Sequence, residues 1–247
     1  VCNALAISVM AFALPAYADW TLSGTSGEVS MSDGTYTLYL TVLDSEARTL
    51  MLGKKSGGSG TGKKSLATGG ESIGGSFDLS QRIVDANGNE WTIVEVGPYA
   101  FYNNKVVTGT IYIPSVTNIA DGAFGYATSV SSFTLGNKLE RIGASAFNST
   151  FGNISFSPSF PTSLKHIGAA AFAHHTKWDL GQIMKLQGTL ELRGIETIEK
   201  SAFFRAENIE KVIIGSKLTS FCESGSSVDS MEVTKGAFER CDKLHTI

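Results

Sequence analysis

The sequence predicts a β-rich solenoid, in which parallel strands stack and are joined by short helical turns, preceded by a small β-meander and a hairpin cap. Two observations carry this prediction. The first is the dipeptide Ala-Phe, which recurs six times at steps of 23, 23, 25, 31 and 35 residues, each time four positions after an aliphatic residue. The aliphatic residues are Val96, Ile119, Ile142, Ile167, Ile198 and Val233, and the dipeptides begin at Ala100, Ala123, Ala146, Ala171, Ala202 and Ala237.

The second observation is a short run of alternating apolar residues in most repeats, as in Ile111-Tyr112-Ile113 and Leu190-Glu191-Leu192. A period of two predicts a strand. Repeats of about 20–29 residues with fixed apolar positions are typical of leucine-rich-repeat solenoids. One strand per repeat would stack in parallel, and the Phe rings would form an internal ladder between tight turns or short helices.

The N-terminal segment resembles a secretory signal peptide. Residues 4–14 are apolar and uncharged, and Ala16-Tyr17-Ala18 matches the A-x-A cleavage pattern. The stretch is too short to cross a bilayer as a helix, which takes about 20 apolar residues. We expect residues 1–18 to be removed and the mature chain to start at Asp19, secreted or at the cell surface. A buried N-terminal strand or helix is the alternative.

Three zones lie between the signal peptide and the repeats. In residues 19–52 the side chains alternate between two faces with a period of two, which predicts a β region in which Leu38 and Leu40 share one face. Residues 53–75 are rich in Gly, Ser and Lys and predict a flexible linker or loop. Residues 76–95 carry Asn87-Gly88 between apolar runs, a hairpin signal, and are expected to cap the first repeat. Residues 96–247 hold the repeats, and the strand pattern still reaches Ile247, so we expect the array to continue beyond it.

The repeat motif resembles a known family. Ile142-Gly143-Ala144-Ser145-Ala146-Phe147 and residues 167–172 match I-G-x-x-A-F, and residues 111–114 match the strand end I-x-I-P. This pattern resembles the BspA-type leucine-rich repeats of bacterial surface proteins, from about residue 94 to the end of the chain. The resemblance implies a secreted or cell-surface protein that mediates adhesion, often to host proteins or other bacteria.

Charge and cysteine content exclude several functions. The net charge is −3, with 20 basic and 23 acidic residues and no basic stripe, so nucleic acid is not an expected partner. After Asp19 no segment is long and apolar enough to span a membrane. Outside the signal peptide only Cys222 and Cys241 remain; Cys241 is expected to be a buried core thiol, and a disulfide between the two stays open.

The sequence offers no catalytic or cofactor-binding constellation. Residues 57–65 resemble a phosphate-binding loop, but Lys64 stands where a hydroxyl residue is required. His174-His175 are expected to be solvated turn residues, because adjacent side chains diverge and rarely bind one metal ion. We therefore expect no enzyme activity, no cofactor and no metal.

Partner binding is expected on residues that alternation turns outward and on the insert that contains Trp178. A protein ligand on a host or bacterial surface is the first expectation. A carbohydrate-binding module, favoured by exposed aligned aromatic residues, and a structural spacer are the alternatives. The outward candidates are Tyr112, Thr134, Ser155, Glu191 and Arg193.

Overall fold

The computed structural model describes residues 20–34, 36–54, 77–105, 107–150, 153–155, 160–174, 186–221 and 236–245. The expected signal peptide, almost all of the expected linker, Trp178 and Cys222 lie outside these residues.

The described residues form strands and turns, and none of them is assigned to a helix, so the short helical turns expected from the sequence are wrong. The seventeen strands are β1 (Trp20–Leu22), β2 (Glu28–Ser32), β3 (Thr37–Asp44), β4 (Thr49–Leu52), β5 (Phe77–Asp78), β6 (Ile83–Val84), β7 (Glu90–Val96), β8 (Thr110–Ile113), β9 (Asn118–Ile119), β10 (Ser132–Leu135), β11 (Arg141–Ile142), β12 (Asn153–Ser155), β13 (His166–Ile167), β14 (Gly188–Leu192), β15 (Thr197–Ile198), β16 (Ile209–Ile214) and β17 (Ser220–Phe221).

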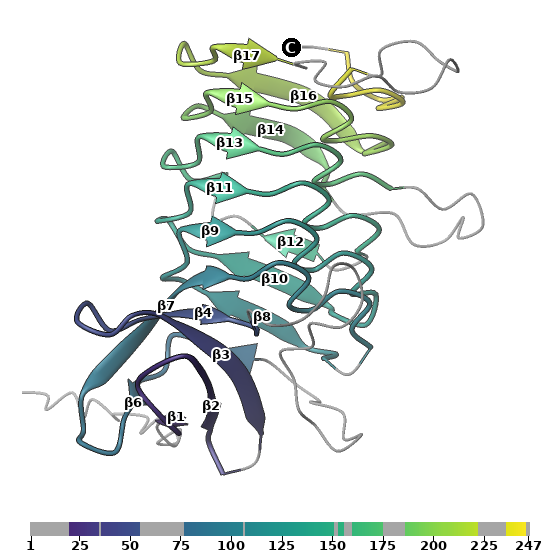
Figure 1. The fold of residues 1–247 in the computed structure, drawn as a ribbon. Coiled ribbons are helices and arrows are strands. Elements are labelled where there is room, and N and C mark those ends of the chain that lie inside the picture. The colour runs from purple at the N-terminus through teal and green to yellow at the C-terminus, as the bar shows by residue number, and fades with distance from the viewer. Residues whose placement is uncertain are drawn as a thin grey trace, which may run out of the picture.

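Six of the first seven strands close into a small barrel at the N-terminal end (Figure 1). Strands β1 to β4 pair in order as an antiparallel meander. Strand β6 pairs with β1 and β7, and β7 pairs with β4, so the ring of hydrogen bonds returns to its start. The inward side chains are buried and apolar: Trp20, Leu22, Val29, Met31, Leu38, Leu40, Leu50, Leu52, Ile83, Trp91 and Ile93.

The hairpin predicted at Asn87-Gly88 is confirmed as the connection between β6 and β7. Gly88 has a φ of 79°, a left-handed conformation that glycine adopts without steric cost. The Asp85 carboxylate organises the turn, because it accepts hydrogen bonds from the Asn87 and Asn89 backbone N–H groups and from Trp91 Nε1. The hairpin and the meander, which the sequence presents as separate zones, are therefore parts of one closed sheet.

Strand β7 also begins the repeats. Its carboxyl end pairs in parallel with β9, and β11, β13, β15 and β17 follow, one strand in each coil of the stack. Longer strands form the opposite side of the coils, as a sheet in the order β12-β10-β8-β5 and a pair β14-β16 (Figure 1). The predicted alternation is confirmed, since Ile111, Ile113, Leu190 and Leu192 are buried and Tyr112 is half-exposed.

The coils approach one another so closely that some positions cannot carry a side chain. A Cβ atom at Gly136 would lie 1.9 Å from the Pro114 carbonyl oxygen, and one at Gly194 would lie 1.9 Å from the Thr162 carbonyl oxygen. These glycines therefore set the spacing between neighbouring backbones at the ends of the longer strands. His174, expected to be solvated, is instead buried in the stack.

Candidate binding surface

The outward residues predicted from the sequence lie on the longer strands. The strand register places Tyr112 beside Thr134, and Thr134 beside Ser155, so that β8, β10 and β12 contribute one row. Tyr112 and Thr134 are half-exposed, and the Thr110 hydroxyl contacts the Ser132 hydroxyl in the same sheet. Strands β8 and β10 carry no charged residue, so this row offers hydroxyl groups and one aromatic ring.

Glu191 and Arg193 lie on the separate pair of strands β14 and β16. Glu191 is half-exposed beside Ile213, and Arg193 is exposed just after β14. Arg193 Nε lies 2.8 Å from Glu191 Oε2, so the two residues form an ion pair with each other. The structure thus joins Tyr112, Thr134 and the Ser155 backbone in one sheet, joins Glu191 to Arg193 in another, and leaves Trp178 outside the described residues.

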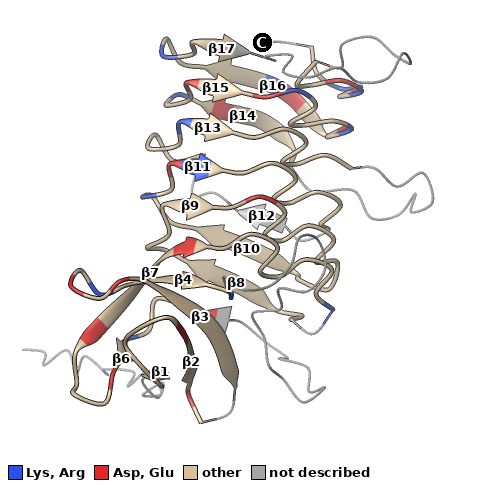
Figure 2. Ribbon diagram, viewed as in Figure 1, with Lys and Arg blue, Asp and Glu red and all other residues tan. Residues whose placement is uncertain are grey.

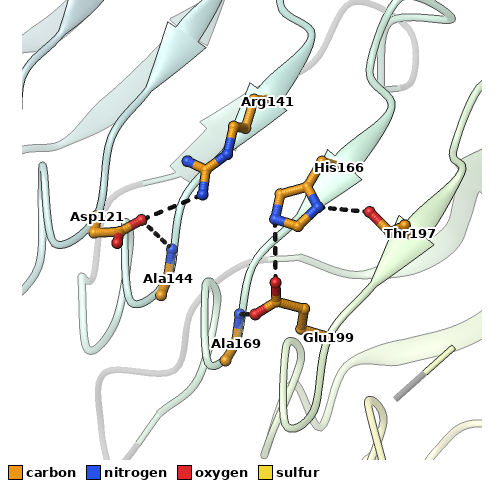
Figure 3. Close-up of polar contacts among 7 residues, drawn as sticks. All are labelled: Asp121, Arg141, Ala144, His166, Ala169, Thr197 and Glu199. Carbon is orange, nitrogen blue, oxygen red and sulfur yellow. Dashed lines mark hydrogen bonds and ion pairs between the residues drawn. The ribbon is translucent and has the colours of Figure 1, made fainter. Parts of the chain in front are cut away.

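A second outward surface was not predicted. Figure 2 shows acidic and basic residues on β7, on β11 and on the bends beside the short strands, while β8 and β10 carry none. We call this surface the charged face. It comprises Asp121, Glu140, Arg141, Lys165, His166, Thr197 and Glu199. Figure 3 draws Asp121, Arg141, His166, Thr197 and Glu199.

Strand register fixes the charged face. Asn118, Arg141, His166 and Thr197 are aligned across β9, β11, β13 and β15, and the isoleucine after each of them is buried in the core. Only one residue of each short strand therefore points outward, and the stack repeats that position from coil to coil. Along this face Lys165 Nζ lies 3.1 Å from Glu140 Oε2, and Arg141 Nη2 lies 3.6 Å from Asp121 Oδ1.

Two carboxylates bind the backbone of neighbouring coils. Asp121 Oδ1 accepts a hydrogen bond of 2.9 Å from the Ala144 N–H, and Glu199 Oε2 accepts one of 2.8 Å from the Ala169 N–H (Figure 3). A Cβ atom at Gly143 would lie 2.3 Å from Asp121 Oδ1, so glycine at that position gives the carboxylate its access. These bonds hold Asp121 and Glu199 in fixed orientations at the surface.

His166 lies at the centre of the charged face, half-buried. Its Nδ1 is hydrogen bonded to the Thr197 hydroxyl, and its Nε2 lies 3.4 Å from Glu199 Oε1. Burial is the main cause that lowers the pKa of His166, and the Arg141 charge lowers it further, while Glu199 and Asp121 oppose them. The imidazole is therefore neutral near pH 7.

The line from Thr197 through His166 to Glu199 contains a hydroxyl, an imidazole and a carboxylate, the groups of a nucleophilic triad. Such a triad also requires backbone or side-chain donors for the developing oxyanion. The two N–H groups beside this line, those of Ala144 and Ala169, already donate to carboxylates. Across the described part of the chain no three His, Cys, Asp or Glu side chains are grouped to hold a metal ion. The arrangement is a row of polar side chains on the surface of consecutive coils.

Comparison with known proteins agrees with the repeat pattern. The profile of the BspA type leucine rich repeat region matches six copies, over residues 71–179 and 94–245. The chain belongs to the BspA-type leucine-rich-repeat family. Proteins of this family are surface proteins with a binding role. No curated protein matches the chain.

A search of solved structures found a leucine rich cell surface protein from Faecalibacterium prausnitzii A2-165. It is 16% identical, with a TM-score of 0.42, and the match covers 77% of this chain and 44% of that protein. The chain thus spans less than half the length of the protein that it matches. None of the described residues belongs to a helix that could cross a membrane.

The BspA-type repeats contain a signal that would have revealed the charged face. In every copy through the fifth, the residue directly before the fixed aliphatic is polar: Glu95, Asn118, Arg141, His166 and Thr197. The longer alternating runs display period two directly, whereas a strand of two residues shows no period.

Proposed function

We propose that this chain is an exported, non-enzymatic solenoid protein of the bacterial cell surface, which adheres to a protein on a host cell or on another bacterium. The charged face is its main contact surface. The observation that carries this proposal is that exposed ion pairs link consecutive coils on one side of the stack, Asp121 to Arg141 and Glu140 to Lys165.

The electrostatics of this face suit association with another protein. Its ion pairs are about half exposed, with side-chain exposures of 44% for Arg141, 49% for Lys165 and 54% for Glu140. Exposed pairs of this kind contribute only about 0–1 kcal/mol each. A partner with complementary charges can therefore replace them at small cost, and the fixed spacing of the coils then selects the partner by its charge pattern.

The residues chosen from the sequence provide a second contact region in this proposal. Tyr112 is a half-exposed ring in a row of hydroxyl groups, and tyrosine is enriched among residues that dominate binding energy. Arg193 is exposed after β14 and can exchange Glu191 for an acidic group of the partner. Trp178, Ser155 and Thr134 stay predictions for the same region.

The test is binding of the secreted chain to an array of purified extracellular-matrix proteins and bacterial surface proteins. We expect the variant Arg141→Glu/Lys165→Glu to lose binding by about tenfold or more, as charge reversal does at complementary interfaces. Binding by the unchanged protein should also weaken as ionic strength rises, because these groups are exposed. The matched control is Arg48→Glu/Arg82→Glu, which changes the net charge equally on exposed barrel residues.

A second variant, Tyr112→Ala/Arg193→Glu, measures the contribution of the longer strands. Loss of binding only in this variant would move the contact surface from the charged face to that side of the coils. Equal binding by both variants and the unchanged protein would contradict the proposal. Turnover of a hydrolase substrate by the purified chain would overturn its non-enzymatic part.

A further inference from the structure

Three half-exposed tyrosine side chains lie together on the turns of the first two coils, away from the strands of both surfaces described above. The rings of Tyr99 and Tyr102 meet edge to face, with centroids 5.6 Å apart and planes at 77°. The rings of Tyr102 and Tyr126, on consecutive coils, meet in the same way at 5.5 Å and 68°. We call these three residues the tyrosine patch.

The backbone holds the tyrosine patch in place. The Tyr99 N–H donates to the Asp121 carbonyl at 3.1 Å, and the Tyr126 N–H donates to the Asn148 carbonyl at 2.8 Å. A Cβ atom at Gly122 would lie 2.5 Å from the Tyr99 ring, and one at Gly125 would lie 3.1 Å from the Tyr102 ring. Both rings therefore rest directly on the backbone of the next coil, and little conformational entropy is lost when a ligand binds them.

The fold does not require tyrosine at the position of Tyr99. The residue two before the repeated Phe adopts almost the same left-handed φ in several coils: 55° at Tyr99, 53° at Ser145, 52° at Ala170 and 55° at Ser201. Small residues thus make the same turn. The buried Phe rings, and not these tyrosines, form the core of the coils. A bulky aromatic residue in a left-handed conformation is sterically unfavourable, which indicates that the ring serves another purpose.

The polar atoms of the patch are available to a ligand. Among the described residues, none forms a hydrogen bond with the hydroxyl group of Tyr99, Tyr102 or Tyr126. Burial, together with the two neighbouring tyrosines, raises the pKa of Tyr102, so its hydroxyl stays protonated and can donate. The patch therefore presents aromatic rings and several hydroxyl groups, and its own side chains are uncharged near pH 7.

We infer that the tyrosine patch is a binding site for a neutral oligosaccharide of pyranose units. A pyranose ring presents a face of C–H groups, which packs on an aromatic ring, and a rim of hydroxyl groups, which pair with phenolic hydroxyls. The combination of fixed rings and unbonded hydroxyls matches both features of one ligand class. An acidic or basic ligand would find no opposite charge within the patch. The patch borders the charged face at Asp121, whose carbonyl accepts the Tyr99 N–H, but it shares no side chain with that face.

The test is a titration of the secreted chain with maltohexaose, cellohexaose and mannohexaose, monitored by calorimetry and by chemical shifts of the tyrosine ring protons. We expect at least one of the three to bind and to shift the ring protons of the patch. In Tyr102→Ala, which removes the central ring, affinity should fall by about tenfold or more. Tyr102→Phe keeps the ring packing and removes one hydroxyl, so it should give an intermediate loss.

Tyr39→Ala is the matched control, because it removes a half-exposed tyrosine on the barrel strand β3, and it should bind like the unchanged protein. Circular dichroism establishes that each variant is folded. If Tyr102→Ala does not fold, the comparison uses Tyr102→Phe and Tyr126→Phe, which retain the rings. Absence of binding by all three oligosaccharides, or binding that the patch variants leave unchanged, overturns the inference.

Discussion

Phe147 stacks on Phe172 with ring centroids 5.4 Å apart and planes within 3° of parallel. The same contact joins the repeated Phe of every pair of consecutive coils, from Phe101 to Phe238, at 4.9–5.4 Å. The internal ladder predicted from the dipeptide is thereby confirmed. Because each ring between Phe101 and Phe238 contacts one ring above and one below, the ladder couples each coil to the next.

Removal of a ring from the middle of this ladder should strongly destabilise the protein. Phe147 and Phe172 are fully buried, and truncation of a buried Phe to Ala costs about 3–5 kcal/mol. We expect Phe147→Ala and Phe172→Ala to lower the free energy of unfolding by this amount, measured by urea denaturation. Tyr112→Ala, a half-exposed ring, is the control and should cost far less. Melting temperatures within a degree of the unchanged protein would contradict the ladder's role.

Glycines at the ends of the longer strands should tolerate no side chain. In Gly194→Ala the new methyl group would meet the Thr162 carbonyl oxygen at 1.9 Å, so one backbone has to move. Overpacking of this kind typically costs about 1–3 kcal/mol. Gly236→Ala is the matched control, because a Cβ atom there meets nothing within 4 Å. Equal unfolding midpoints for the two variants would contradict the close approach of the Gly194 and Thr162 backbones.

The barrel should lose stability in acid through Asp85. The side-chain hydrogen bond from Asn89, with further ones from Trp91 and the turn backbone, lowers the pKa of this carboxyl from 3.8 to about 2. A carboxyl with a lowered pKa in the folded state stabilises the protein above about pH 4, and this contribution is lost as the pH falls towards 2. We expect Asp85→Asn to be less stable at neutral pH. Its free energy of unfolding should also fall less than that of the unchanged protein between about pH 4 and pH 2. Thermal unfolding as a function of pH, with the exposed Asp242→Asn as control, measures the difference.

The buried thiol of Cys241 should be inert. Its Sγ donates to the Phe203 carbonyl at 3.2 Å, and burial is the main cause that raises its pKa to about 11. The thiolate is the reactive form, so a chain with Cys2 and Cys222 replaced by Ser should react slowly with a disulfide reagent at about pH 8. Addition of denaturant should expose the Cys241 thiol, which should then react rapidly. Fast labelling of the folded chain would show that the last described coil opens.

The sequence predicts the repeat geometry well because one coil repeats the same few physical requirements. Ile111 and Ile113 alternate with Tyr112, and the Phe ladder follows from the spacing of the dipeptide. The closed barrel cannot be predicted in this way, because it depends on a long-range pairing. The pairing of β4 with β7 joins Leu52 to Val96 across more than forty residues, and no local pattern reports such a contact.

The two outward surfaces show the same limit. Arg141, His166 and Glu199 come together because consecutive coils are stacked in register, although 25 and 33 residues separate them along the chain. The tyrosine patch combines Tyr99 and Tyr102 with Tyr126 of the following coil, and nothing in the composition distinguishes these three from the remaining tyrosines. An alignment of the copies on the repeated Phe places Tyr99, Tyr102 and Tyr126 within two positions of that Phe.

Strand β7 is shared by the barrel and the first coil, so the barrel covers the N-terminal edge of the repeat sheet. Additional coils can therefore stack only towards the opposite edge. A duplicated coil inserted after β9 would lengthen the molecule by about 4.8 Å and would leave the barrel unchanged. Each insertion would also shift the distal end of the charged face relative to the tyrosine patch. Gene duplication of single coils would therefore lengthen the solenoid in steps of one coil, while the barrel at its N-terminal end keeps its structure.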